Sequence, residues 1–293
     1  MTAAEFSTAA EISEPGLPRR VAIVGVGLLG GSVALSLKRL PSAPSTIGWA
    51  RSSATADRLR SWDGLDQVTT DLNAAVDAAD VVVVATPVSM IAKWIEQIAA
   101  IVPPTTLITD VGSTKATIVA QCRQPNFVAA HPIAGSEQSG FEHATADLFD
   151  NKPVVITPGN TSDPDLVTRC ESFWRCVGGN PSRLSAETHD RVLAGISHVP
   201  HLISSLVAAR TPAKSLPFVG SGWRDITRVA AGDVPMWMAI VAENRPAIAD
   251  ELEQMSTDLT SLIAAIRTGD DDAVQQLLQS GVDSRRQSER FEA

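Results

Sequence analysis

The chain has 293 residues, of which 44% are hydrophobic and 19% are charged, and its formal net charge is −9. This length and composition allow two domains with buried cores. The acidic balance argues against a nucleic-acid surface, because phosphate binding needs clustered Lys and Arg. The most apolar segment, Val192 to Ala209, is interrupted by Ser, His and Pro. We therefore expect no run of the ~18 apolar residues that span a bilayer.

The first 18 residues combine Thr, Ala, Glu and Ser with two prolines and contain no apolar stretch. This composition predicts a disordered arm over residues 1–18, without the hydrophobic segment of an export signal. The three cysteines, Cys122, Cys170 and Cys176, lack metal-ligand spacing, and their odd number favours reduced thiols. We therefore expect a cytoplasmic protein without a metal site.

Short apolar segments separated by helix-length segments follow from residue 20 onward. This alternation is typical of parallel strands joined by crossover helices. It predicts an α/β domain over residues 19–179. The expected strands cover residues 20–24, 46–49, 81–85, 106–109, 127–130 and 153–157.

A glycine motif stands between the first expected strand and the helix after it. Gly25, Gly27 and Gly30 form GxGxxG, with Leu28 and Leu29 inside it. In this context the first glycine permits a tight turn, the second lets the backbone approach a pyrophosphate, and the third lets the helix pack on the strand. The helix N-terminus offers free N–H groups to the anion. The segment therefore predicts a dinucleotide site.

The residue that separates NAD from NADP is expected about 20 positions after the glycines, as an acid on the ribose 2′-hydroxyl. Here the second strand is followed by Ala50-Arg51-Ser52-Ser53. A guanidinium and two hydroxyls suit a 2′-phosphate, so we expect NADP or NAD, with NADP preferred. The alternative is that Arg51 is a surface charge that stacks on the adenine. Thr86 and Pro87 follow another strand and should border the cofactor on position alone.

Two polar segments follow neighbouring strands of the expected sheet. Ser113 lies in DVGSTK (110–115), and His131 opens HPIAGSEQSG (131–140). Because carboxyl ends of parallel strands share one edge of a sheet, both side chains should face the nicotinamide. An imidazole there suits proton removal beside a redox cofactor.

The composition changes after residue 179, and the remainder predicts an all-α domain over 180–293, with helices at 186–209, 236–266 and 273–278 and a loose tail of about a dozen residues. Residues 252–266 keep an apolar three- and four-residue spacing that could pack internally or against a second subunit. His198 and His201 share one helix face. They could contact a ligand or be bonded to the carbonyls of a helix kinked at Pro200.

Five segments together resemble the prephenate and arogenate dehydrogenases of tyrosine biosynthesis: GVGLLGGS (25–32), DVGSTK, HPIAGSEQSG, SHVPHL (197–202) and DITR (225–228). Their order and spacing match over about residues 20–270. The resemblance implies a Rossmann-type dinucleotide-binding domain followed by a helical dimerisation domain, hence a homodimer. It also implies oxidative decarboxylation of a dianionic cyclohexadienol, without a metal.

Carried over to this chain, the resemblance implies that His131 is the catalytic histidine, that Ser113 orients its hydrogen bonds and that Arg228 binds a substrate carboxylate. A planar guanidinium can bind a carboxylate through two hydrogen bonds. Glu137 could gate the site or pair with Arg228, or be a surface acid. We expect prephenate as substrate, with arogenate as the alternative.

Two other classes of protein share part of this pattern. A β-hydroxyacid dehydrogenase shares the domain order but needs a lysine base in its helical domain, where Lys214 is the only lysine and lies in a loop-like stretch. A non-catalytic dinucleotide-sensing protein would keep the nucleotide site but would not need Ser113, His131 and Arg228 together.

Overall fold

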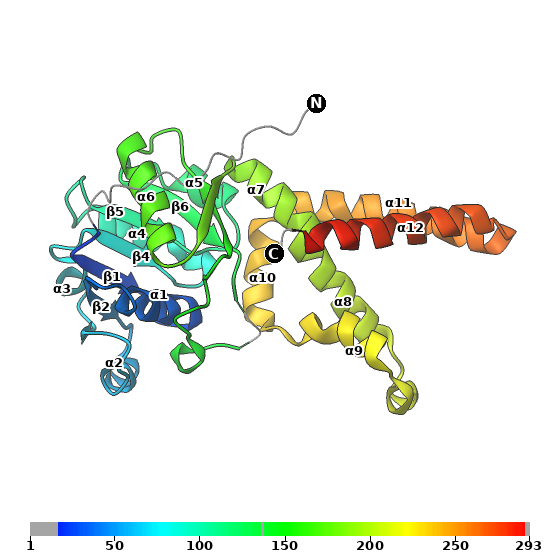
Figure 1. The fold of residues 1–293 in the computed structure, drawn as a ribbon, viewed down its shortest axis with the longest axis horizontal. Helices are drawn as coiled ribbons and strands as arrows, with labels where there is room; N and C mark the ends of the chain where they lie inside the picture. The colour runs from blue at the N-terminus through cyan, green and yellow to red at the C-terminus, as the bar shows by residue number, and fades with distance from the viewer. Residues whose placement is uncertain (1–16, 136–137, 291–293) are drawn as a thin grey trace.

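The structure is a computed structural model that describes residues 17–135 and 138–290. Figure 1 shows an α/β domain at one end and a helical part from which two long projections extend. The predicted arm over residues 1–18 lies, apart from Leu17 and Pro18, outside the described residues.

The first domain is built on one eight-stranded sheet with the order β3-β2-β1-β4-β5-β6-β7-β8. β7 is antiparallel to β6, and all other neighbours are parallel. The six predicted strands are confirmed, and two short polar strands, β3 and β8, are additional. The strands are β1 (Arg20–Val24), β2 (Ser45–Trp49), β3 (Gln67–Thr69), β4 (Val81–Val84), β5 (Leu107–Asp110), β6 (Phe127–Pro132), β7 (Pro153–Thr157) and β8 (Asn180–Arg183).

Helices cover both faces of this sheet, which explains why its central strands are continuous apolar runs. One core contains buried residues of α1, α2 and α6, and the other contains buried residues of α3, α4 and α5. The helices are α1 (Leu28–Lys38), α2 (Ser53–Arg60), α3 (Leu72–Val76), α4 (Val88–Ala99), α5 (Ala116–Gln121), the 3-10 turn η1 (Phe141–His143) and α6 (Pro164–Cys176).

The boundary predicted at residue 179 is four residues too early. β8 pairs in parallel with β7, so the sheet continues to Arg183. The turn before it uses Gly178, whose φ of +97° favours glycine. The sequence of β8 is NPSR; Pro181 is half-buried and the other three residues are exposed. The sequence therefore contains no apolar pattern that would predict this edge strand.

The helical part contains more breaks than its apolar pattern predicted. The expected helix at 236–266 is divided at Asn244, and the expected loose tail is helical as far as Glu289. A left-handed Gly269 ends α11 and the Asp270 carboxylate caps α12, so the two form a hairpin. The elements are α7 (Ala186–Leu193), the π-turn η2 (Ala194–His198), α8 (Val199–Arg210), the 3-10 turn η3 (Ala213–Phe218), α9 (Ser221–Thr227), the 3-10 turn η4 (Arg228–Ala231), α10 (Val234–Glu243), α11 (Arg245–Thr268) and α12 (Asp271–Glu289).

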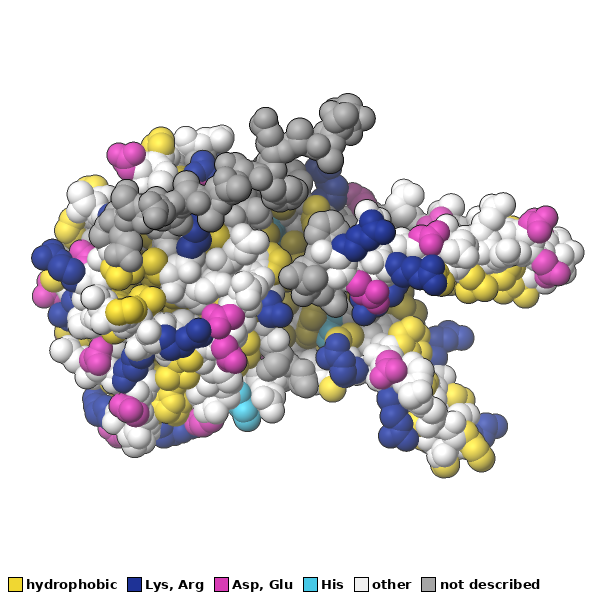
Figure 2. Space-filling view, in the orientation of Figure 1, with side chains coloured by type: hydrophobic (Ala, Val, Ile, Leu, Met, Phe, Trp, Pro, Cys, Tyr) yellow, Lys and Arg dark blue, Asp and Glu magenta, His cyan; other side chains and the backbone are white. Residues whose placement is uncertain are grey.

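The helical part docks on the α/β domain through two helix pairs, α7 on α5 and α10 on α4. Beyond these contacts, the α11–α12 hairpin and the arm formed by α8 and α9 project away from the body (Figure 1). Both projections carry exposed apolar side chains, visible in yellow along the hairpin in Figure 2. They include Leu206, Phe218, Ile226, Leu259, Ile266, Leu277 and Leu278.

The continuous helix formed by α7, η2 and α8, Ala186–Arg210, is long and apolar enough to cross a membrane. This differs from our expectation that no segment reaches that length. Its buried side chains nevertheless include His189, Asp190 and His198. All three contact polar groups of the α/β domain or of the α10–α11 junction. We interpret it as the central helix of the helical domain.

Candidate active site

The glycine motif has the geometry that a dinucleotide site requires. Gly25 has a φ of +95°, and a Cβ there would lie 2.7 Å from the Ala85 carbonyl oxygen. A Cβ on Gly30 would lie 2.3 Å from the Gly25 carbonyl oxygen, so helix α1 can approach β1 only without a side chain. At Gly27, by contrast, nothing lies within 4 Å of an added Cβ.

Gly27 also leaves the first turn of α1 open, because no side chain caps this helix. Its free N–H groups can therefore receive an anion. Leu28 and Leu29 form the first turn and are half-buried. Thr86 lies against Gly25, and its hydroxyl is buried without a hydrogen-bond partner among the described residues. Pro87 starts α4 beside it. These residues fit a dinucleotide.

The segment after β2 presents the groups expected near the adenosine ribose. Ala50 is buried, whereas Arg51, Ser52 and Ser53 are exposed. The Ser52 hydroxyl accepts a hydrogen bond from the Thr55 amide and caps α2. Arg51 forms no ion pair among the described residues. Its guanidinium is therefore available to a ligand.

His131 lies near the carboxyl end of β6, at the same edge of the sheet as the glycine motif. Its side chain is only 9% exposed, and its Nδ1 lies 2.8 Å from Nε2 of His189. Burial is the main cause that lowers the pKa of His131 well below its usual range, and His189, Lys115 and His198 add to it. A neutral imidazole at pH 7 can accept a proton.

Sequence reasoning missed His189 and Asp190, which lie on α7. Nδ1 of His189 is 2.7 Å from Oδ1 of Asp190. The Asp190 carboxylate accepts the backbone N–H groups of Lys115 and Ala116, each at 2.8 Å. An adjacent His-Asp pair on an otherwise amphipathic helix was the available signal, but nothing local connects it with a strand end 58 residues away.

A buried ion pair holds the backbone next to His131. Lys115 and Asp110 have fully buried side chains that pair with each other. Lys115 Nζ also donates to the Ala130 carbonyl at 2.9 Å, and Asp110 Oδ1 accepts the Ala130 N–H at 3.0 Å. Asp110 Oδ2 accepts the Gly112 N–H as well. The segment DVGSTK therefore forms hydrogen bonds to both main-chain groups of Ala130, the residue that precedes His131.

Ser113 lies in the turn after β5 and is half-buried. Among the side-chain hydrogen bonds of the described residues, none joins Ser113 to His131. Its hydroxyl therefore stays available to a ligand in this structure. The neighbouring Thr114 is fully buried, and its hydroxyl has no partner among the described residues.

His198 is almost completely buried at the end of the π-turn η2. Its Nδ1 accepts a hydrogen bond from Nδ2 of Asn244 at 3.1 Å, and the same amide donates to the Asp190 carbonyl at 2.7 Å. Burial lowers the pKa of His198 to about 4. The Asn244 amide therefore connects α7 and η2 to the α10–α11 junction, and its bond to His198 favours the scaffold interpretation of that histidine.

His201 has a different environment one turn later. Its ring stacks on Trp237 of α10 with centroids 3.5 Å apart and an interplanar angle of 12°. No hydrogen bond joins it to the other described residues, although it is buried. Gly232 makes the space, because a Cβ there would lie 2.7 Å from Trp237 Nε1 and 3.0 Å from the His201 ring. An unpaired buried imidazole is suited to a ligand.

Arg228 begins η4, which packs against α8, the helix that carries His201. Its side chain is exposed and takes part in no ion pair among the described residues. Glu137, its suggested partner, lies outside the described residues. The molecular surface is hollowed between the α/β body and the helical part in Figure 2.

The segment after residue 140 is attached to the dinucleotide helix. The Thr145 amide donates to Ser32 Oγ on α1, and Ser36 Oγ donates to the Ala146 carbonyl. Asp150 pairs with Arg39 at 2.9 Å, so its carboxylate is engaged at the end of α1. Hydrogen bonding by Thr145 lowers the pKa of the exposed Asp147.

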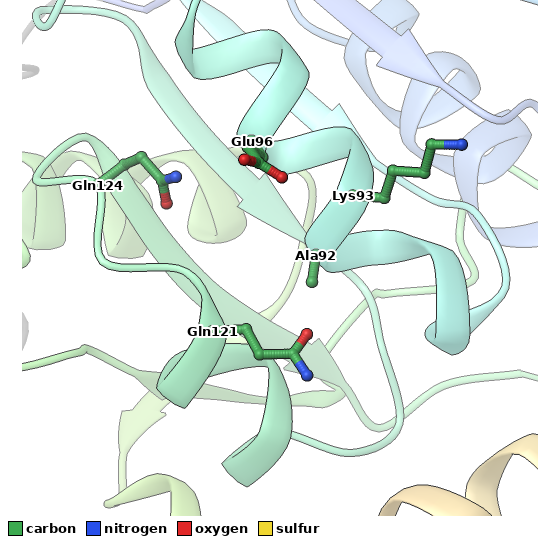
Figure 3. Close-up of a pocket in the computed structure, with 5 residues that line it drawn as sticks. All are labelled: Ala92, Lys93, Glu96, Gln121 and Gln124. Atoms are coloured by element: carbon green, nitrogen blue, oxygen red, sulfur yellow. The ribbon is translucent and has the colours of Figure 1, made fainter.

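A separate surface pocket lies between α4 and α5, and none of the predicted site residues lines it (Figure 3). Its lining is mostly polar, and it carries no imidazole or guanidinium. It is formed by Ala92, Lys93, Glu96, Gln121 and Gln124. Over residues 17–135 and 138–290, no group of three or more His, Cys, Asp or Glu side chains could hold a metal ion.

Comparison with known families gives a direct assignment. The model described as "Prephenate dehydrogenase, nucleotide-binding domain" matches residues 33–181, and "Prephenate dehydrogenase, dimerization domain" matches residues 185–280. The chain belongs to the prephenate dehydrogenase family. The two matches meet between residues 181 and 185, just where β8 ends. A cyclohexadienyl dehydrogenase from Zymomonas mobilis is 33% identical over 267 residues, covering 87% of this chain and 90% of the relative.

Other members of the prephenate dehydrogenase family are similar in sequence and in structure. A Bacillus subtilis prephenate dehydrogenase is 32% identical over 254 residues, which are 83% of this chain and 68% of that protein. The Aquifex aeolicus prephenate dehydrogenase, solved with hydroxyphenyl propionate and NAD+, has a TM-score of 0.86 at 27% identity, covering 93% of this chain and 99% of the other. The Synechocystis arogenate dehydrogenase has a TM-score of 0.80 at 27% identity, covering 92% and 99%.

Proposed function

We propose that this protein is a prephenate dehydrogenase that converts prephenate to 4-hydroxyphenylpyruvate with NADP or NAD. The observation that carries the proposal is the environment of His131, a buried imidazole with a pKa well below its usual range on the sheet edge that also carries the dinucleotide motif. Membership of the family and the five matching segments support the same reaction.

His131 is proposed as the proton acceptor. It accepts the proton of the ring hydroxyl as hydride leaves the ring carbon that bears this hydroxyl. The bond between the ring and its carboxylate breaks, the electron pair completes the aromatic ring, and carbon dioxide departs. When bound, the dinucleotide supplies the hydride acceptor. Since aromatisation favours the products, the protein mainly orients the substrate and complements its charge.

Arg228 is proposed to bind a carboxylate of the dianionic substrate, and His201 and Ser113 to contact it from the helical and the α/β side. The guanidinium of Arg228 is exposed, and neither it nor the imidazole of His201 has a polar partner among residues 17–135 and 138–290, which supports these roles. His198 is proposed as a supporting residue, because Asn244 occupies its Nδ1.

Selectivity for NADP is proposed to depend on Arg51. An acid that would repel a 2′-phosphate is missing after β2, and the guanidinium is free to bind one. Ser53 can add a hydroxyl, whereas the Ser52 hydroxyl already caps α2.

Arogenate remains the second candidate substrate, because a Synechocystis arogenate dehydrogenase and a cyclohexadienyl dehydrogenase are both similar to this chain. Arogenate carries an ammonium where prephenate has a keto group, so a hydrogen-bond acceptor or an acid placed there would distinguish them. Of the candidate acids Glu137, Asp147 and Asp150, Asp150 is paired with Arg39 at the end of α1. This leaves Asp147 and Glu137.

The protein is proposed to act as a cytoplasmic homodimer formed by the helical domain. The exposed apolar residues on the hairpin and the arm are the surface that a second copy would cover, since large apolar patches mark association sites. Cys122 and Cys170 are buried thiols, in line with a reducing compartment.

One experiment tests the proposed activity. Purified protein is incubated with prephenate or arogenate, each crossed with NADP or NAD, while reduced cofactor is followed by absorbance and the product by chromatography. We expect the fastest turnover with prephenate and NADP. A protein that binds dinucleotide but turns over neither substrate would instead be a dinucleotide sensor.

A further inference from the structure

Three buried side chains form a chain of contacts from α7 to the catalytic strand. Asp190 Oδ1 lies 2.7 Å from Nδ1 of His189, and His189 Nε2 lies 2.8 Å from Nδ1 of His131. His189 is fully buried, and Asp190 is 3% exposed. Both come from the helical domain, whereas His131 belongs to the α/β domain. The contact therefore crosses the boundary between the two domains.

The hydrogen-bond partners of Asp190 determine which atom donates and which accepts in each of these contacts. Its two carboxylate oxygens accept the backbone N–H groups of Lys115 and Ala116, so at both oxygens it serves as acceptor. His189 must therefore carry its proton on Nδ1 to bond with Oδ1. If His189 has a single ring proton, its Nε2 is an acceptor.

We propose that Asp190 and His189 are positioning residues that fix His131 in the tautomer with its proton on Nδ1, which leaves Nε2 as the proton acceptor for the substrate. This inference rests on the proposed function only for its catalytic consequence. The opposite order of protons would place a proton on Nε2 of His131 and remove the lone pair that accepts the hydroxyl proton. A side chain that orients a catalytic imidazole in this way is common in proteases with a Ser-His-Asp triad.

The DVGSTK segment supports the relay, by which we mean the contacts Asp190–His189–His131, at two further points. Its backbone N–H groups hold Asp190, and its Lys115 and Asp110 side chains hold the Ala130 main chain. The main chain before His131 and the ring of His131 are thus attached to the same turn. Rigid support from surrounding groups is what catalytic geometry requires.

A purely structural role is the competing explanation, since α7 packs on α5 and His189 lies at that contact. The two explanations differ in what they require of residue 189. A positioning role requires a hydrogen-bond acceptor opposite Nδ1 of His131. A packing role requires only volume.

Two variants separate these requirements. His189→Phe keeps a ring but removes the acceptor, whereas His189→Gln can place its carbonyl oxygen where Nε2 of histidine was. We expect kcat to fall about 10- to 100-fold in His189→Phe, as for loss of a group that supports general base catalysis. His189→Gln should recover most of that loss. The dinucleotide dissociation constant and the melting temperature should be the same in the two variants.

His143→Asn is the matched control, because His143 is exposed on η1 and takes no part in the relay. It should retain wild-type kcat. Wild-type kcat in His189→Phe, or an equal loss in His189→Phe and His189→Gln, would overturn the proposal.

The tautomer can also be measured directly in the wild-type protein, whether or not the His189 variants fold. Long-range proton–nitrogen NMR spectra of protein labelled with nitrogen-15 histidine distinguish protonated from unprotonated ring nitrogens, and the His131→Asn spectrum assigns the His131 signals. We expect a proton on Nδ1 and none on Nε2. A proton on Nε2 would refute the relay even in an active enzyme, whereas absent turnover of both substrates would refute only the proposed function.

Discussion

Replacing Lys115 by methionine tests the buried support of the site. Lys115 is fully enclosed and contacts the Asp110 carboxylate and the Ala130 carbonyl. Burial lowers its pKa, and the nearby Asp110 opposes that shift. Methionine has a similar length and no charge, so Lys115→Met removes the ion pair with little loss of packing.

The expected cost comes from the charge that stays behind. Asp110 would remain buried without its cation, and breaking a buried ion pair from one side typically costs about 3–5 kcal/mol. Asp110 would keep the N–H groups of Gly112 and Ala130 as donors, so we expect the lower half of that range. Removing both charges in Lys115→Met with Asp110→Asn should cost less than the sum of the single changes by at least about 1 kcal/mol.

Urea unfolding measures these values, with the free energy extrapolated linearly to water. Trp174 is a suitable fluorescent reporter, because it is completely buried in the core of the α/β domain. Exposed Lys93→Met serves as the control for loss of a lysine. A Lys115→Met protein within about 1 kcal/mol of wild type, or additive costs in the double variant, would show that the pair does not support the strand end.

Four further outcomes are expected. His131→Asn should lower turnover about 100-fold or more because the proton acceptor is lost; near-wild-type turnover would exclude that role. Arg228→Ala should mainly raise the Michaelis constant for the substrate, and an unchanged constant would exclude carboxylate binding. Arg51→Ala should weaken NADP more than NAD in binding titrations, whereas equal losses would mean that it does not select. His198, whose pKa is lowered to about 4, binds a proton between pH 6.5 and 4 mainly when unfolded, so its contribution to folding stability should be complete above pH 6.5. That contribution should fall by about 3 kcal/mol as the pH drops to 4, and the pH slope of urea-unfolding free energy should be smaller in His198→Asn. Equal slopes would contradict this.

Much of the first domain was predictable because its signals are local. The strands covered on both faces are apolar runs such as Val81–Val84, and the glycine motif has the same consequence wherever a strand leads into a helix. The short strands β3 and β8 were missed because they are polar and obtain their hydrogen bonds from neighbours that the sequence does not identify. The break at Asn244 was missed for a similar reason. Its side chain bonds to His198 and to the carbonyl of Asp190, which lie on a different helix.

The candidate site was predictable in part. His131, Arg228 and the glycines were identified from motifs, whereas His189 and Asp190 have no motif and only the packing of α7 on α5 brings them to the strand end. The pairing of Lys115 with Asp110 was also unrecognised, although both residues lie in a segment that had been singled out.

From the order of residues alone follow the dinucleotide-binding sheet and the helical second half, since each depends on spacing within a few tens of residues, and the five matching segments point to His131 as the proposed proton acceptor. The folded chain decides which nitrogen of that histidine is free, because the hydrogen bonds that determine it come from a helix of the other domain. Burial likewise lowers the pKa of His131 and of Lys115, because desolvation depends on every group packed around them and on no single neighbour in the sequence.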